Sequence, residues 1–354
     1  MHRNIIFVHA KTLAEAKFKL KTALGVSDDY YQHCKMFPIY GTGQGSTNSP
    51  TILLIISSTL FDIHKELSNR ATFSDTVQEI EVHITLVGFV DDVTGQTNDF
   101  YNEDVTPEEL IHLMQEDAQV WKNLLWLTGG LLELDKCSYH FIWYQFLQDG
   151  TPVMQSTRPG PPLIVQQSHN KTHTEIKYKN PYTPHTTLGH LKAPGGGNVS
   201  QKNSLQRKSE RYAIKASTSS LSHHKAKMYY NSCYIKLVGY VLGQCFFTQA
   251  GLEEIETDTI WVFTSRMGYN KNMAKVIRGS PKSTAGVSIT PLIGIQGSEQ
   301  VKNFLRHMQS DSQAQKLLVI ACSWTQHQCG WHTSILEDVG SCLPHFEARW
   351  LKAL

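Results

Sequence analysis

The chain has 354 residues, of which 40% are hydrophobic and 18% are charged, with a formal net charge of +2. This length allows two or three packed units, and the charge is too small to indicate a polyanionic partner by itself. The longest apolar stretch, residues 51–61, is shorter than the roughly 20 residues of a bilayer-spanning helix. An odd number of cysteines, seven, and the lack of a signal-peptide pattern predict an intracellular, non-secreted protein, cytoplasmic or nuclear, with no membrane partner.

The first predicted elements are two helices that flank a glycine-rich loop. Residues 11–24 place apolar side chains at helical spacing, and Gly25 follows as a C-cap. The loop carries the run YGTGQGS at 40–46, and Ser49-Pro50 then suits an N-cap followed by a first-turn proline. We therefore expect a buried helix over 51–67. Taken alone, the glycines also fit an ordinary loop.

A hairpin is predicted next, with two carboxylates at its turn. Residues 79–90 mix β-branched and polar side chains and run into Asp91-Asp92, after which residues 93–95 begin a second strand. Two adjacent like charges are destabilising unless a cation offsets them. Metal-assisted phosphoryl transfer requires carboxylates fixed on rigid strands. Aspartate is also common in turns for backbone reasons alone.

Helices and short strands alternate after the hairpin. Thr106, Pro107 and Glu109 predict a capping box that opens a helix toward Leu127. The aromatic run at 137–146 and the Asp149-Gly150 turn predict a small sheet that continues to about residue 191. Pro194 and three glycines then mark a domain boundary. Beyond it, helical patterns are found at 225–242, 298–308 and 311–325.

The order of these motifs resembles that of the reverse transcriptase family, most closely the non-LTR retroelement type. The matching series is the glycine-glutamine-glycine loop with Ser-Pro, the hairpin FVDD at 89–92, the run GGLLELDKCSY at 129–139 and the strand at 187–189. The resemblance covers residues 11–243. It implies an RNA-directed DNA polymerase that extends a DNA primer on an RNA template, using deoxynucleoside triphosphates and Mg²⁺.

The resemblance also implies roles for particular residues. Asp91 would coordinate metal, with Asp92 in support at the same site. Lys136 would neutralise or protonate the departing pyrophosphate, although a solvated surface lysine is the common alternative. The remaining residues would contact substrate or nucleic acid: Gln44, Gly45, Ser46 and Phe89 beside the nucleotide, and Leu188 and Gly189 in a primer-gripping strand.

A basic segment begins where the family's thumb domain begins. It contains one acidic residue, Glu210, among seven basic ones: Lys202, Arg207, Lys208, Arg211, Lys215, Lys225 and Lys227. Such side chains favour contacts with phosphates that do not depend on sequence. A solvated helix face would have the same composition.

The expected fold is α+β, with a polymerase palm built on a ferredoxin-like antiparallel sheet, followed by a mainly helical thumb and a C-terminal extension. The expected boundaries are 1–192 for the partial palm, 193–260 for the thumb and 261–354 for the extension. The family's first catalytic strand precedes the first helix, and none of the residues there is acidic. We therefore expect an N-terminally truncated palm with an incomplete metal site and impaired polymerisation.

Two other functions are compatible with the sequence. The first is a catalytically inactive, nucleic-acid-binding remnant of a retroelement that uses the basic segment. The second is a small zinc-binding protein built on Cys322, His327, Cys329 and His332. The spacing of these four residues fits no common zinc template, and Cys322 in a helix is also typical of a buried small residue.

Overall fold

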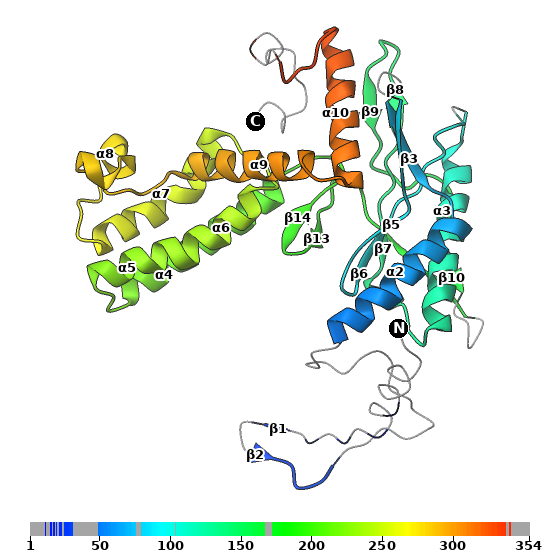
Figure 1. The fold of residues 1–354 in the computed structure, drawn as a ribbon, viewed down its shortest axis with the longest axis horizontal. Coiled ribbons are helices and arrows are strands. Elements are labelled where there is room, and N and C mark those ends of the chain that lie inside the picture. Colours follow the sequence, from blue (N-terminus) through cyan, green and yellow to red (C-terminus); the bar gives the residue numbers. More distant parts are fainter. Residues whose placement is uncertain are drawn as a thin grey trace. The chain divides into compact units, whose positions relative to one another are not determined.

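The computed structural model describes residues 11, 15, 17, 19, 21–22, 25–30, 49–75, 79–102, 104–166, 172–337 and 340 (Figure 1). The chain forms two compact units, and each is described by itself. The first comprises Met1–Thr72, His83–Tyr139 and Arg158–Tyr178, and the second comprises Phe73–Val82, His140–Thr157 and Lys179–Leu354.

The helix predicted over residues 11–24 is wrong from Lys17 onward, because Lys17 and Lys19 are not helical. Strand β1 (Lys21–Thr22) pairs antiparallel with β2 (Gly25–Val26), so residues 21–22 are extended. Gly25 has a φ of 135°, a conformation that glycine adopts far more readily than other residues. It therefore supports a tight reversal between the strands rather than a helix C-cap.

Two helices form the support of the first unit and lie where they were predicted. The burial predicted for the first of them is wrong, because Leu54, Ile55, Ile56 and Ile63 are exposed and only Leu60 and His64 are buried. Helix α2 (Ser49–Leu67) packs on α3 (Pro107–Leu127), with Leu60, Trp121 and Leu124 buried between them. The capping box at the start of α3 is confirmed. The Thr106 hydroxyl accepts a hydrogen bond from the Glu109 amide at 3.3 Å, and the Glu109 carboxylate accepts one from the Thr106 amide at 2.9 Å.

The strands of the first unit are short and paired two by two. They are β5 (Leu86–Phe89) with β6 (Asp92–Gly95), β10 (Ile164–Gln166) with β11 (His173–Glu175), and β7 (Ser138–Tyr139) with β12 (Lys177–Tyr178). The last pair is parallel, and the other two are antiparallel. A further pair, β3 (Ala71–Asp75) with β4 (Ile80–Ile84), has residues in both units. A mixed α+β fold is thus confirmed, whereas the ferredoxin-like palm sheet stays a prediction.

Two hairpins belong to the second unit. Strand β8 (Tyr144–Phe146) pairs with β9 (Pro152–Met154) around the predicted turn, where Gly150 has a φ of 82°. Strand β13 (His185–Thr187) pairs with β14 (His190–Lys192). The predicted aromatic strand over 137–146 is therefore split between β7 and β8.

Helices dominate the rest of the second unit (Figure 1). They are α4 (Val199–Thr218), α5 (His223–Tyr229), the π-helical turn η2 (Tyr230–Tyr234), α6 (Ile235–Leu242), α7 (Gln249–Arg266), α8 (Lys275–Gly279), the 3-10 turn η3 (Lys282–Thr284), α9 (Leu292–Met308) and α10 (Gln313–Cys329). The predicted helices over 225–242, 298–308 and 311–325 are confirmed. Helices α4 and α7 were not predicted. The expected boundary at 192–193 falls between β14 and α4, and that at 260–261 falls within α7.

One hydrophobic core holds this helical region together. Its largest fully buried side chains include Tyr230, Tyr234, Phe263 and Leu292. The ring of Phe263 lies 5.1 Å from that of Tyr230 and 6.0 Å from that of Tyr234, within the range of aromatic pairing. None of the helices in the described ranges has the length and apolarity needed to cross a membrane.

Candidate functional site

The predicted aspartate hairpin is the clearest feature of the first unit. Strands β5 and β6 pair Phe89 with Asp92, so Val90 and Asp91 form a two-residue turn. The side chains of Phe89, Asp91 and Asp92 are all exposed. The hairpin therefore presents two adjacent carboxylates and an aromatic ring to solvent.

The backbone at the tip of the hairpin is strained. Val90 has a φ of 58°, in the left-handed region that β-branched residues rarely adopt. Type I′ and II′ hairpin turns need a positive φ at this position, which glycine or asparagine would usually supply. Non-glycine residues held in such conformations cluster at binding and catalytic sites.

Helix α2 supports the hairpin directly at Gly88. A Cβ atom at this position would overlap the Phe61 ring and would come within 2.8 Å of its Cε2 atom. The Phe61 ring in turn lies 5.7 Å from the ring of Trp121 on α3. Glycine therefore lets strand β5 approach α2 closely, immediately before the two aspartates.

Lys136 lies in the 3-10 turn η1 (Leu134–Lys136), and its side chain is exposed. The chain just before it is anchored by Leu132, which packs against the same Leu60–Trp121–Leu124 cluster as Val93 of β6. The predicted lysine and the predicted aspartates thus belong to segments with a common support from α2 and α3.

A buried polar network, missed by the sequence analysis, ties the same elements together. The Asp117 carboxylate of α3 accepts hydrogen bonds from the Asn69 amide at 2.7 Å and from the Thr97 hydroxyl at 2.5 Å. Asn69 follows α2 and Thr97 follows β6. Burial raises the pKa of Asp117 and lowers that of neighbouring His64, whose Nε2 lies 3.2 Å from the Asp117 carbonyl oxygen. A lone aspartate within an amphipathic helix gave no signal of this role.

The remaining predicted nucleotide-contact residues, Gln44, Gly45 and Ser46, lie outside the described residues.

The predicted primer-gripping residues belong to the second unit and form a turn rather than the predicted strand. Leu188 and Gly189 join β13 to β14, with φ values of 50° and 82°. The Tyr240 hydroxyl donates a hydrogen bond to the Leu188 carbonyl at 2.8 Å, and the His190 ring lies 4.7 Å from the Tyr240 ring. Burial, with smaller effects from Lys192 and Lys208, lowers the pKa of His190.

Most of the predicted basic segment lies on α4. The Lys202 ammonium is neutralised by Glu254 of α7 at 2.5 Å. Arg207, Arg211 and Lys215 follow one another at four-residue intervals and are exposed, whereas Lys208 is half-buried. Four-residue spacing puts them on one face of the helix, so α4 carries a basic stripe.

The cysteine and histidine residues near the C-terminus do not form a metal cluster in the part of the chain that the structure describes. No group of three or more metal-binding side chains occurs among those residues. Cys322 and Cys329 pack with Trp331 around buried Ile335, and burial raises the pKa of the Cys322 thiol. This apolar packing gives the zinc alternative no support.

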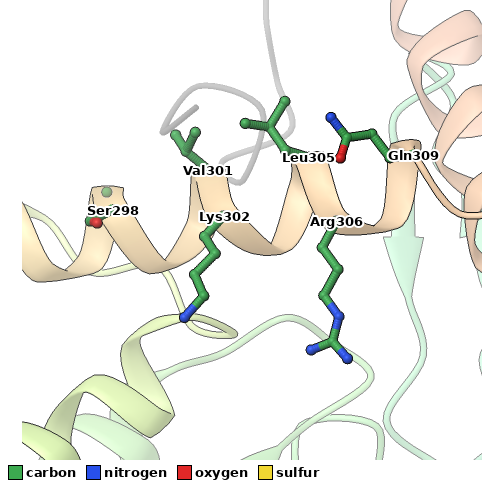
Figure 2. Close-up of a pocket in the computed structure, with 7 residues that line it drawn as sticks. Ser298, Val301, Lys302, Leu305, Arg306 and Gln309 are labelled. Atoms are coloured by element: carbon green, nitrogen blue, oxygen red, sulfur yellow. The ribbon is translucent and has the colours of Figure 1, made fainter.

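An open groove runs along α9 and contains none of the predicted site residues. It is lined by Gly297, Ser298, Val301, Lys302, Leu305, Arg306 and Gln309. Figure 2 shows Val301 and Leu305 on one side of the helix, with Lys302 and Arg306 on the other. Six of the seven residues belong to this one helix, and Gln309 is its C-cap.

Comparison of the chain with protein-family models, curated proteins and solved structures gives no match. Function is therefore inferred from the residues themselves.

Proposed function

We propose that the chain is the palm and thumb part of a reverse transcriptase of the non-LTR retroelement type, an RNA-directed DNA polymerase. The observation that carries this proposal is the β5–β6 hairpin. It presents Asp91 and Asp92 side by side at a turn strained at Val90. The order of the surrounding motifs gives further support.

Asp91 and Asp92 are the residues that would hold Mg²⁺. Magnesium commonly binds through one or two protein carboxylates, with water and substrate phosphates as its other ligands, so an exposed aspartate pair fits this ion. Bound there, Mg²⁺ would supply charge stabilisation at the phosphates during nucleotidyl transfer. Exposed Lys136 would neutralise or protonate the pyrophosphate leaving group.

The partners in this proposal are an RNA template, a DNA primer and deoxynucleoside triphosphates. The stripe of Arg207, Arg211 and Lys215 on α4 offers three exposed cations to a phosphate backbone. The Leu188–Gly189 turn would contact the primer. Gln44, Gly45, Ser46 and Phe89 would lie beside the incoming nucleotide.

The second candidate function is nucleic-acid binding without catalysis, as in an inactive retroelement remnant. The charge distribution favours this candidate independently of the hairpin. Residues 193–337 contain 16 lysines and arginines against 8 aspartates and glutamates. This segment is therefore distinctly basic, although the whole chain carries only +2.

Primer extension on an RNA template separates the two candidates. A catalytic hairpin predicts Mg²⁺-dependent incorporation of deoxynucleotides by the purified chain, with a loss of at least about a hundredfold in Asp91→Asn. Asp149→Asn is the matched control, because Asp149 is also an exposed aspartate at a hairpin turn. Incorporation that survives in Asp91→Asn would contradict the catalytic role. Nucleic-acid binding without incorporation would favour the remnant.

A further inference from the structure

Charge is segregated along the helices of the second unit. All four acidic residues of α7, at positions 253, 254, 256 and 258, lie in its first ten residues. From residue 259 to residue 298 there is no aspartate or glutamate, whereas there are five lysines and arginines. The second half of α7 and the connection to α9 therefore carry only positive charge.

The acidic half of α7 neutralises the cations that are nearest to it. Glu254 pairs with Lys202 of α4 at 2.5 Å, and Glu253 pairs with Lys275 of α8 at 2.9 Å. Buried Glu256 interacts with Arg278 over a longer range. Lys202 and Lys275 are thus paired with acids within the fold, and Arg278 lies close enough to buried Glu256 for the two charges to interact.

Packing at the other end of α7 gathers cations from separate segments. A Cβ atom on Gly268, which follows α7, would come within 2.7 Å of the His223 ring of α5. The Lys227 ammonium of α5 donates a hydrogen bond to the Val287 carbonyl at 2.8 Å. Burial lowers the pKa of Lys227, and the nearby Lys282 ammonium lowers it further. Figure 1 shows α5 and the end of α7 in this helical region.

We define the basic end as the cations on these segments and on the last turn of α4: Lys215, Lys225, Lys227, Arg266, Lys271 and Lys282. None of the six forms an ion pair with another described residue. The helix dipole accounts for Lys215 and Arg266, which lie in last turns. It does not account for Lys271 in the loop or for Lys282 beside Lys227, and like charges held together destabilise a fold.

The chemistry of the basic end fits a phosphate backbone better than a lipid surface. Membrane-surface binding requires apolar side chains beside the cations. The exposed aliphatic and methionine side chains of this region, Ile214, Met228, Val276 and Ile277, are divided among α4, α5 and α8 and form no single apolar face on one helix. Helix α8 is in addition held to the acidic half of α7 through Lys275. The loop around Lys271 instead carries asparagines at 270 and 272, whose amides donate hydrogen bonds to phosphate oxygens.

We propose that the basic end is a second nucleic-acid contact surface, which binds the phosphate backbone of a duplex independently of sequence. This inference rests on the proposed function, and it adds Arg266, Lys271 and Lys282 to the surface expected from α4 and α5. It also removes Lys202 from that surface, because Glu254 neutralises Lys202.

Binding of the full chain to a short RNA–DNA hybrid duplex, followed by fluorescence anisotropy over a range of salt concentrations, tests this proposal. The double variant Lys271→Glu/Lys282→Glu should weaken binding on the order of tenfold and should reduce the salt slope by about 2. The control is Lys236→Glu/Lys316→Glu, which makes the same charge change at exposed positions on α6 and α10. The control should change the affinity by less than about threefold.

Circular dichroism of each variant establishes that it is folded. Equal weakening by both double variants would overturn the proposal, because net charge alone would then explain binding. Unchanged affinity in Lys271→Glu/Lys282→Glu would overturn it and leave the proposed polymerase intact. If the wild-type chain binds no duplex, the nucleic-acid partner of the proposed function fails as well. Binding to phosphatidylserine vesicles in place of the duplex would overturn the proposal in favour of a lipid surface.

Discussion

At the scale of single residues, the groups that orient the candidate site are distinct from those that would react. Asp91 and Asp92 are exposed, whereas His64 is only 2% exposed and Asp117 only 7%. The Asp117 carboxylate holds the chain after α2 and the chain after β6 through short hydrogen bonds from Asn69 and Thr97. A buried polar group that loses its partner costs about 1–3 kcal/mol, so these contacts fix the base of the hairpin.

His64 predicts a specific loss of stability in acid. Burial lowers the pKa of its imidazole below the ordinary value of 6.5. The neutral imidazole therefore makes its full contribution to the free energy of unfolding above about pH 6.5. That contribution is lost as the pH falls through the folded-state pKa. A single titrating group can change the free energy of unfolding by at most about 1.4 kcal/mol per pH unit.

Urea unfolding between about pH 5 and pH 8 measures this effect. His64→Gln, which retains hydrogen bonding but cannot titrate, should show a flatter decline in the free energy of unfolding than the wild type. Identical pH profiles would mean that His64 is protonated as readily in the folded chain as in the unfolded chain.

Sequence patterns could not reveal these residue-scale features. The positive φ of Val90 is opposite to the preference of a β-branched side chain. It therefore emerges only from the register of the two strands. The two groups that donate hydrogen bonds to the Asp117 carboxylate, from Thr97 and Asn69, lie 20 and 48 residues away from it along the chain. By contrast, the hairpin with Asp91 and Asp92 at its turn was predicted. The residues that signal its strands lie directly before and after the two aspartates in the sequence.

At the scale of elements, the contact between β5 and α2 determines where the hairpin lies. Gly88 and Gly95 provide a matched pair of tests within this hairpin. A Cβ atom on Gly88 would overlap the Phe61 ring, whereas one on Gly95 would meet the Leu86 side chain at an ordinary 3.4 Å. Gly88→Ala should lower the free energy of unfolding by about 1–3 kcal/mol, and Gly95→Ala by less than about 0.5 kcal/mol.

Urea denaturation of the two variants checks this prediction. Equal effects of the two substitutions would mean that β5 does not pack against Phe61 as the structure has it.

Helices with a clear signal in the sequence were predicted, and there are physical reasons why the two long helices α4 and α7 were missed. Helix α4 is mostly polar, and its buried face is made largely of small or polar residues such as Gln201, Ser209 and Ala213. Helix α7 has apolar residues on several faces because it contacts α4, α5 and α9. Neither helix therefore shows the single apolar stripe that identifies an amphipathic helix. The capping box at Thr106, which is a local signal, marked the start of α3 correctly.

At the scale of the whole molecule, charge is divided unevenly along the chain. The excess of cations in residues 193–337 must be offset by an excess of acids elsewhere, because the net charge is only +2. Such a division is typical of a protein that contacts a polyanion through one region. The basic residues of α4 and α5 were predicted from the sequence as one segment. Arg266, Lys271 and Lys282 were not predicted, because they join that segment only through packing around Gly268 and Val287.

Asp91 and Asp92 are proposed to form a metal-binding centre for nucleotides, and the proposed polymerase depends on that centre. The proposed centre is tested most directly by Mn²⁺ binding in the presence of a deoxynucleoside triphosphate, followed by electron paramagnetic resonance of the free ion. The wild-type chain and Asp149→Asn should bind Mn²⁺ with the nucleotide to the same extent. Asp91→Asn and Asp92→Asn should each lose at least about tenfold in affinity. Equal Mn²⁺ binding by all four proteins would contradict the assignment of the hairpin as the metal site.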